Sequence, residues 1–337
     1  MAKADVAGVA AAAPFAALLG RLDPRRPVLV QTHDYPDIDA VASAWALSGL
    51  LARRGYSASA AYRGEIRSRS LARLVEVLGI EIAGSSPAGD RAQLLVVDGA
   101  PANGNVSLFA GELVGIVDHH RIFGEARAPF ADLRPELASC SSMIYGYWKE
   151  AGAEPPRELA TALIAGIQSD TDFLSRRSSP EDFRAYTELF RLGDWELASR
   201  IVRTVFDLRE LGLIARALSG AVAEEGLLYA EVEGPCGQEA LAVLADFALR
   251  AEELRATVVA ERDEAGLHFS ARSRSADFSA FDLVREALQG LGTGGGHSHA
   301  SGGFVPAAAN PGRDEIRERF FAAAARLAAS APPQAGR

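Results

Sequence analysis

The sequence is poor in cysteine and in lysine, and it contains no long uninterrupted hydrophobic run. Its two cysteines, Cys140 and Cys236, lie far apart and outside any CxxC or Cys/His spacing. Such isolated cysteines exclude a disulfide framework and a cysteine-based structural zinc site. We expect both to be buried as small hydrophobic side chains in a reducing compartment.

No apolar run reaches the ~18 to 20 residues that a membrane-spanning helix requires. Residues 6–20 resemble the hydrophobic part of a signal peptide, but they contain Pro14 and are preceded by a single cationic residue, Lys3. We therefore predict an N-terminal helix that continues to Leu22, in a cytoplasmic protein without a membrane partner.

Only Lys3 and Lys149 are lysines among the 35 basic residues, so the arginine content says little about phosphate binding. The formal charge of −9 argues against the extended basic face that binds long duplex nucleic acid. It is compatible with a small anionic substrate held by a local cluster. With 337 residues, of which 48% are hydrophobic and 23% charged, the chain has the profile of a globular protein of two domains.

From residue 27 onward, short apolar runs alternate with helical patterns. This alternation predicts an α/β fold whose N-terminal domain contains a doubly wound, mostly parallel sheet. We predict strands at 28–31, 57–62, 93–97 and 113–117, and helices at 38–54, 68–78 and 141–150.

Residues 157–225 have a mainly helical pattern, in which Leu208, Leu211, Ile214 and Leu218 form an apolar stripe expected to pack or to bridge domains. A second, smaller α/β domain follows, with strands at 227–232, 256–262 and 267–272 and helices at 238–250, 281–288 and 313–328. We thus divide the chain into a catalytic domain (1–205), a helical linker (206–226) and a substrate-binding domain (227–330).

The first polar cluster follows the predicted strand 28–31. It contains His33, Asp37 and Asp39, three candidate metal ligands within seven residues, at the start of a helix of small and apolar residues. Pro36 suits the first turn of that helix, and acidic residues complement its positive end. Capping alone would also explain the two aspartates.

Three further clusters follow predicted elements in the same way. Asp98 and the tripeptide Asp118-His119-His120 end apolar strands, and Asp170 follows an apolar helix. Each aspartate by itself is typical of a turn or a cap. Because ligand crevices of open α/β sheets lie beyond the carboxyl ends of the strands, we expect these positions to converge.

Together the four clusters offer four carboxylates and two imidazoles, which is too much negative charge for one crevice unless cations neutralise it. We predict two divalent metal ions. Mixed oxygen and nitrogen donors suit Mn²⁺ best, with Mg²⁺, Co²⁺ or Zn²⁺ as substitutes. The predicted ligands are His33, Asp37, Asp39, Asp98, His119 and Asp170.

These motifs resemble, in order and approximate spacing, those of the DHH phosphoesterase superfamily. The run Gly294-Gly295-Gly296-His297, with Ala300 and Gly302 after it, is similar to the GGGHxxAxG element of the DHH-associated domain. The resemblance covers about residues 15 to 325. In size the chain resembles the branch of nanoRNases and 3′-phosphoadenosine 5′-phosphate (pAp) phosphatases rather than the longer single-strand exonucleases.

The resemblance implies a role for each motif residue. His33, Asp37 and Asp98 would hold one metal ion, and Asp39, Asp98, His119 and Asp170 the other, with Asp98 shared. His120 would face the substrate phosphate, and Asp118 would orient the histidines. We accordingly regard Asp98, His119, His120 and Asp118 as the catalytic residues. Two such ions can activate water and stabilise an in-line displacement at phosphorus, so no protein nucleophile is required.

The glycine run has three interpretations. It could be a flexible linker, or a dinucleotide loop, although no strand leads into it and no acidic residue follows at the usual distance. The histidine next to it favours the third, a surface that lets backbone approach a phosphate or base. We predict that Gly294, Gly295, Gly296 and His297 bind substrate together with His120, Arg272 and Arg274.

Asp172 departs from the family pattern, in which glycine commonly follows the Asp-Thr pair. This extra carboxylate would alter substrate choice or face solvent. The main hypothesis is a metal-dependent phosphoesterase acting on short single-stranded oligonucleotides or small nucleotides such as pAp. Alternatives are a pyrophosphatase or exopolyphosphatase acting on phosphoanhydrides, and a nucleotide-binding regulator without turnover. A homodimer remains open.

Overall fold

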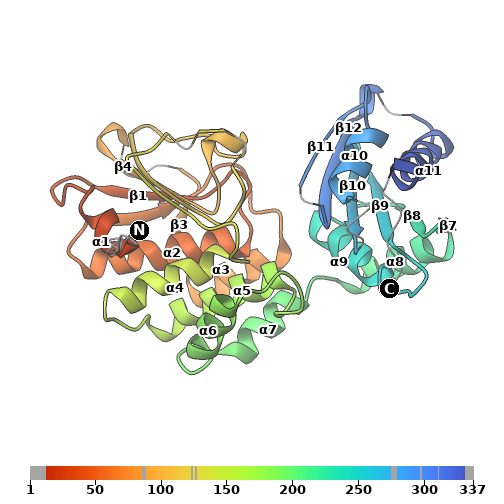
Figure 1. Cartoon of the computed structure of the whole chain (residues 1–337). Coiled ribbons are helices and arrows are strands. Elements are labelled where there is room, and N and C mark those ends of the chain that lie inside the picture. Colours follow the sequence, from red (N-terminus) through yellow and green to blue (C-terminus); the bar gives the residue numbers. More distant parts are fainter. Residues whose placement is uncertain are drawn as a thin grey trace, which may run out of the picture. The chain divides into compact units, whose positions relative to one another are not determined.

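The computed structural model describes residues 13–85, 89–122, 124–125, 127–274, 279–296, 298–309 and 311–330. The chain divides into two compact units, with the boundary between Thr204 and Val205. Figure 1 shows the elements of both units. Within the described residues, no helix is long and apolar enough to cross a membrane.

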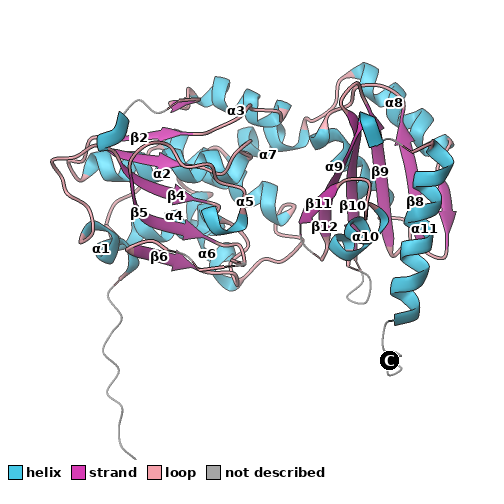
Figure 2. Ribbon diagram, turned by 90° about the horizontal axis from the view of Figure 1, so that it is seen from above, coloured by secondary structure: helices cyan, strands magenta, loops and turns pink. Residues whose placement is uncertain are grey.

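The first unit is built on a parallel sheet of six strands in the order β3-β2-β1-β4-β5-β6, seen side by side in Figure 2. From β1 the chain adds β2 and β3 on one side, and it then crosses to the other side of β1 and adds β4, β5 and β6 in turn. The order in which strands are added therefore reverses between β1 and β4, which are parallel hydrogen-bonded neighbours. This reversal is the topological switch point at which open α/β sheets form their ligand crevice. The strands are β1 (Val28–Gln31), β2 (Ala58–Ala61), β3 (Ile82–Ala83), β4 (Gln93–Val97), β5 (Glu112–Asp118) and β6 (Phe130–Leu133).

Helices cover one face of this sheet. Trp148 and Tyr147 are fully buried there among aliphatic side chains, and burial of such large groups is the main source of stability. The helices are α1 (Pro14–Leu19), α2 (Ile38–Arg53), α3 (Arg69–Leu78), α4 (Cys140–Glu150), α5 (Arg157–Thr171), α6 (Pro180–Leu189) and α7 (Trp195–Arg203).

The opposite face has smaller apolar clusters. Leu94 and Leu29 pack with Phe109, and Val96 packs with Val106. Phe109 and Val106 belong to the connection between β4 and β5, which contains the short 3₁₀ helix η2 (Pro101–Asn103). The predicted α/β fold with a parallel N-terminal sheet is therefore confirmed. Among the described residues, the second face is covered by this connection and not by a layer of helices.

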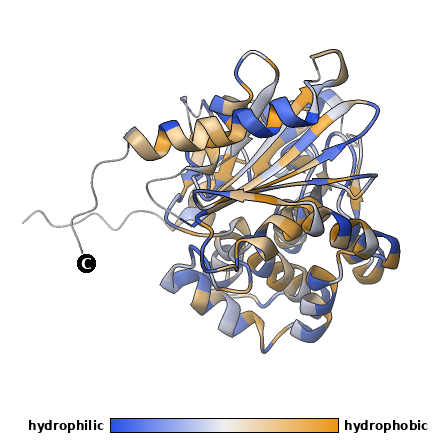
Figure 3. Ribbon diagram, turned by 90° about the vertical axis from the view of Figure 1, so that its right-hand side faces the viewer, coloured by the Kyte–Doolittle hydropathy of each residue, from blue (hydrophilic) through white to orange (hydrophobic). Residues whose placement is uncertain are grey.

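The second unit contains a mixed six-stranded sheet in the order β11-β12-β10-β9-β8-β7. Hydrophobic residues, orange in Figure 3, run along its strands. The strands are β7 (Val222–Glu224), β8 (Leu227–Val232), β9 (Ala256–Arg262), β10 (Gly266–Ser273), β11 (Thr293–Gly296) and β12 (Ala300–Pro306). The helices are α8 (Leu208–Ser219), α9 (Gln238–Ala248), α10 (Ala280–Ala287) and α11 (Arg313–Ser330).

The segment expected to be a helical linker, 206–226, holds α8 and the edge strand β7, which pairs with β8. The predicted apolar stripe on this helix is partly wrong. Leu208 is 88% exposed and Leu211 is 48% exposed, whereas Leu213 and Ala217 are buried against α9 and the sheet. The stripe follows the helical period, but the packed face is rotated away from its first two members.

Candidate metal centre

Four of the predicted motifs meet at the carboxyl edge of the first sheet. His33 lies just beyond β1, Asp98 directly follows β4, and Asp118 is the last residue of β5. Asp170 comes from a helix, in the last turn of α5. The centre is therefore located at the switch point, where side chains distant in sequence become neighbours.

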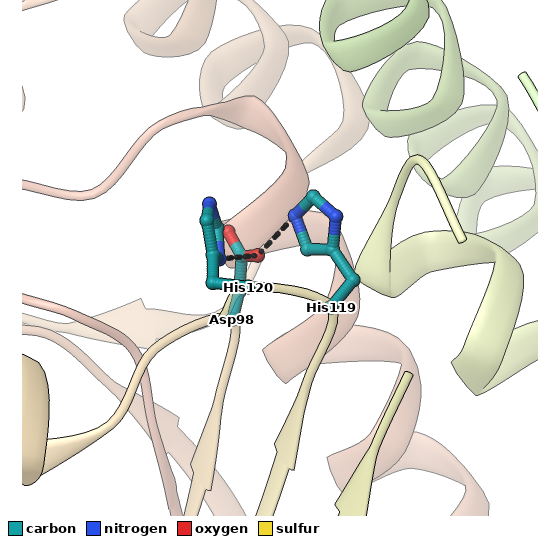
Figure 4. Close-up of side chains that lie close together, drawn as sticks. All are labelled: Asp98, His119 and His120. Atoms are coloured by element: carbon teal, nitrogen blue, oxygen red, sulfur yellow. Dashed lines mark ion pairs between the residues drawn. The ribbon is translucent and has the colours of Figure 1, made fainter. Parts of the chain in front are cut away.

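Asp98 is the most central of these residues. Its carboxylate is 1% exposed and lies between the two histidines that follow β5, as Figure 4 shows. The distance to His119 Nε2 is 3.1 Å and that to His120 Nδ1 is 3.7 Å, while His33 Nε2 lies 3.8 Å from the other carboxylate oxygen. Asp98 thus contacts all three imidazoles.

The backbone of Asp98 has a φ of +57°. This left-handed conformation is unfavourable for most residues other than glycine and is tolerated by aspartate and asparagine. Local strain of this kind persists where the surrounding structure requires it, and it is concentrated at functional sites. Here it directs the carboxylate of Asp98 toward the histidines as the chain leaves β4.

Asp37 both caps α2 and faces His33. Its Oδ1 accepts a hydrogen bond from the Ala40 N–H at 3.0 Å, and its Oδ2 lies 3.7 Å from His33 Nε2. Capping, the simpler explanation of this aspartate, therefore uses one oxygen and leaves the other directed toward the cluster. Although burial works against it, the carboxylates of Asp37 and Asp98 raise the pKa of His33 to about 10.

Asp39 lies in the first turn of α2 and is fully buried against the beginning of α4. Its two oxygens accept hydrogen bonds from the N–H groups of Cys140, at 2.6 Å, and Ser141, at 2.8 Å. The positive end of that helix favours the carboxylate. Burial, together with the charge of Asp98, nevertheless raises the pKa of Asp39 to about 7. Its Oδ2 lies 4.0 Å from His119 Nε2.

His119 is 1% exposed and connects Asp170, the last of the four carboxylates, to the other candidate ligands. Its Nε2 lies 3.4 Å from Asp170 Oδ2. Burial opposes protonation of this imidazole, but Asp98, Asp170 and Asp39 together raise its pKa to about 10. The structure thus brings all six predicted metal ligands to one place.

Asp118 is buried and holds His120 in place. Its Oδ1 accepts hydrogen bonds from the backbone N–H of His120 at 3.0 Å and from the ring Nδ1 at 2.9 Å. Against the effect of burial, this bond and the charge of Asp98 raise the pKa of His120. The ring is 26% exposed, so it combines a fixed orientation with access to solvent.

The donor set fits a pair of metal ions. Three groups have ligand atoms within 4.8 Å of one another: His33, Asp37 and Asp98; Asp39, His119 and Asp170; and Asp98, His119 and His120. Asp98 Oδ1, Asp98 Oδ2 and His119 Nε2 are buried without a hydrogen-bond partner among the described residues. Buried polar atoms normally have partners, and a divalent cation would supply one here.

The glycine run of the second unit is strand β11, paired with β12. Gly294, Gly295 and Gly296 are exposed and line an open hollow of about 510 Å³ together with Arg272 and Phe269. The short strand escaped sequence prediction because a run of glycines carries no alternation of polar and apolar side chains.

The two predicted arginines differ in their surroundings. Arg272 reaches the hollow, and its guanidinium donates to Asp246 Oδ1 at 3.0 Å and to Ser270 Oγ at 3.1 Å. The Arg274 guanidinium instead donates to the backbone carbonyls of residues 251, 252 and 254. Arg274 therefore stabilises the turn after α9. His297 lies outside the described residues.

Asp172, the departure from the family pattern, ends α5 with a φ of +46°. The position requires the left-handed conformation that glycine adopts at no cost, which explains why glycine suits it. Its exposed side chain accepts a hydrogen bond from Ser175 Oγ at 3.2 Å. Of the two predicted alternatives, the structure favours a carboxylate that faces solvent.

Gly166 allows the close packing around Asp39, and the sequence did not predict this role. A Cβ at this position of α5 would lie 2.2 Å from Ser141 Oγ and 2.7 Å from Asp39 Oδ1. The helix must therefore lack a side chain here to approach Asp39 and the beginning of α4. A single glycine in a helical pattern gives no indication of this role without knowledge of its neighbours.

We predict that Gly166→Ala displaces Asp39 and weakens Mn²⁺ binding, with at least a tenfold loss in affinity expected for a disturbed ligand support, as an order of magnitude. Calorimetric titration with Mn²⁺ measures the effect. The matched control is Gly146→Ala in α4, where no atom lies within 4 Å of the added Cβ. Equal affinity of the two variants would show that Asp39 does not need this space.

Comparison with known proteins matches both units. The model of the DHH family, N-terminal domain, matches residues 27–167, and that of the DHHA1 domain matches residues 224–328. An uncharacterised protein of Methanocaldococcus jannaschii is 30% identical over 284 residues, which cover 84% of this chain and 58% of that protein.

A Streptococcus mutans protein named "Probable manganese-dependent inorganic pyrophosphatase" is 31% identical over 150 residues, 43% of this chain and 48% of that protein. The chain thus spans about half the length of the curated relatives it matches. The crystal structure of an exopolyphosphatase-related protein from Bacteroides fragilis has the same fold, with a TM-score of 0.76 at 17% identity, covering 93% of this chain and 94% of the other. Because both domains are present in order along the sequence, the chain belongs to the DHH phosphoesterase superfamily.

Proposed function

We propose that this protein is a two-metal phosphoesterase that hydrolyses short oligonucleotides or small nucleotides such as pAp. The observation that carries the proposal is the set of six candidate ligands around Asp98, whose buried carboxylate faces three imidazoles and forms no hydrogen bond with any other described group. Divalent ions bound there would activate water and stabilise the charge that develops on the phosphate. Mn²⁺ suits this mixed donor set best, and the name of the Streptococcus mutans relative supports the choice.

The protein's own residues divide the remaining work. Asp98 and the other carboxylates hold the ions, and Asp39 is itself fixed by two backbone N–H groups of α4. His120, oriented by Asp118 and partly exposed, is placed to donate a hydrogen bond to a phosphate oxygen. No side chain is required as a nucleophile.

We assign substrate binding to the hollow of the second unit that Gly294, Gly295 and Gly296 line, which we call the glycine hollow. Exposed glycine backbone allows close approach of a phosphate or a base. Arg272 supplies a positive charge at the hollow, where Asp246 and Ser270 fix its guanidinium. We assign nucleotide binding to Arg272, Gly294, Gly295 and Gly296, and by sequence to His297.

The second candidate function is hydrolysis of phosphoanhydrides. It is favoured by the names of two similar proteins, a pyrophosphatase and an exopolyphosphatase-related protein. The pyrophosphatase match extends over only 43% of this chain, whereas the DHHA1 model matches the second unit that contains the glycine hollow. We therefore prefer a nucleotide substrate.

A ladder of single-stranded RNA and DNA, from dinucleotide to 24-mer, tests the proposed substrate class. We expect the fastest hydrolysis at two to five nucleotides, poor hydrolysis of duplex DNA and weak salt dependence, because a net charge of −9 offers no long basic track. Initial rates with Mn²⁺ at fixed strand concentration measure this, beside pAp and polyphosphate. Rates that rise with length, or turnover of polyphosphate alone, would contradict the proposal.

Asp98→Asn tests the two-metal centre. Asparagine has the shape of aspartate and tolerates a φ of +57°, so the fold should persist, as circular dichroism can check. Loss of the shared charge should lower kcat by orders of magnitude, about 10²-fold or more, if both ions depend on it. Near-normal turnover in saturating Mn²⁺ would rule out the shared ligand.

Arg272→Ala separates substrate binding from metal binding. We expect KM for nucleotides to rise about tenfold, as for loss of one charge-assisted hydrogen bond, while calorimetry gives an unchanged number of bound Mn²⁺ ions. His297→Ala should behave alike. The control is Arg285→Ala on α10, an exposed arginine paired with Asp282, which should leave KM unchanged. Loss of a metal equivalent in Arg272→Ala would contradict the assignment.

A further inference from the structure

Tyr35 stands between two metal ligands in an unfavourable conformation. Its φ is +54°, a left-handed value that is costly for a bulky aromatic residue, and its side chain is 50% exposed. The backbone N–H of Tyr35 donates to the carbonyl of Arg63 at 2.8 Å, so the loop after β1 is tied to the loop after β2. An exposed aromatic held under strain beside a reactive centre suggests a function.

The loop after β2 is shaped around this ring. Gly64 has a φ of +82°, and a Cβ there would lie 2.7 Å from a ring carbon of Tyr35. The guanidinium carbon of Arg67 lies 4.0 Å from the ring centroid, over its face. The ring therefore packs against a glycine backbone and positions an arginine.

A second arginine of the same loop provides a contrast. Arg63 also lies over an aromatic ring, that of Phe109 at 4.3 Å, but it donates to the Leu108 carbonyl and is partly buried. Arg67 is exposed and forms no ion pair with another described residue. Its donors are thus held in place by stacking and remain available to a ligand.

The position of this pair follows from the chain itself. Tyr35 is two residues from His33 and two from Asp37, and two residues span at most about 7 Å. Arg67, stacked on the ring of Tyr35, belongs to the same unit and to the loop after β2, whose carboxyl end shares an edge of the sheet with that of β1.

We propose that Arg67, positioned by Tyr35 and Gly64, forms a subsite for a second phosphate of the substrate. The inference rests on the proposed function and extends it, because it makes the enzyme favour nucleotides with a phosphate beside the one that is cleaved. A planar guanidinium with five donors is suited to bind a phosphate dianion through two parallel hydrogen bonds. Tyr35 acts as a positioning residue, through Arg67.

The test compares the dinucleotides pApA and ApA, which differ by one terminal phosphate. In Arg67→Ala, the ratio of kcat/KM for pApA to that for ApA should fall about tenfold, as for one lost charge-assisted contact. Tyr35→Ala should lower the ratio similarly through KM, and Tyr35→Phe, which keeps the ring, should restore it. Arg67→Lys should restore it only partly, because lysine lacks the planar stack.

The matched control is Arg73→Ala, an exposed arginine of α3 that pairs with Glu76. Arg73→Ala should leave the ratio unchanged. An equal fall in the two variants would mean that a general charge effect, and not a subsite at Arg67, determines the ratio. An unchanged ratio in Arg67→Ala overturns the proposal outright.

A wild-type protein that hydrolyses neither of the dinucleotides nor pAp overturns the proposed function instead. The subsite is then decided by calorimetric binding of pAp and AMP to the Mn²⁺-loaded protein. Arg67→Ala should still weaken binding of pAp more than that of AMP. Equal weakening, or none, overturns the subsite.

Discussion

The main physical constraint in the first unit is the concentration of buried negative charge around Asp98. Four carboxylates converge there with few hydrogen-bond donors, and burial together with the charge of Asp98 raises the pKa of Asp39 to about 7. Such a cluster is costly in a protein interior unless cations neutralise it. The raised pKa values of His33 and His119 are consequences of the same crowding.

The topology of the parallel sheet explains how these charged groups come together. Strand ends at the switch point deliver His33, Asp98 and His119 to one edge without long loops. Two helices complete the site from elsewhere in the chain, because α4 presents its N–H groups to Asp39 and α5 contributes Asp170. Gly166 allows these helices to meet, so packing of the core and geometry of the centre depend on each other.

Sequence patterns predicted the elements with strong periodicity or clear boundaries. Strand β4 and helix α2 agree with prediction within one residue, because apolar runs and capping residues mark them. Strand β3 has only two residues, and β11 consists mainly of glycine, so neither contains a pattern to detect. The exposed Leu208 shows a different limit, since periodicity identifies a helix without revealing which face its neighbours cover.

The residues of the candidate site also divide into those that the sequence predicts and those that only the fold reveals. The candidate ligands were predictable because metal chemistry restricts such residues to a few types, here found mostly at strand ends, whereas supporting contacts depend on tertiary structure. Tyr35 has an ordinary place between His33 and Asp37 in the sequence, and only the fold brings Gly64 and Arg67 against its ring. Under the proposed function, loops such as the one after β2 can change substrate choice while the candidate ligand set stays the same, because no candidate ligand lies on them.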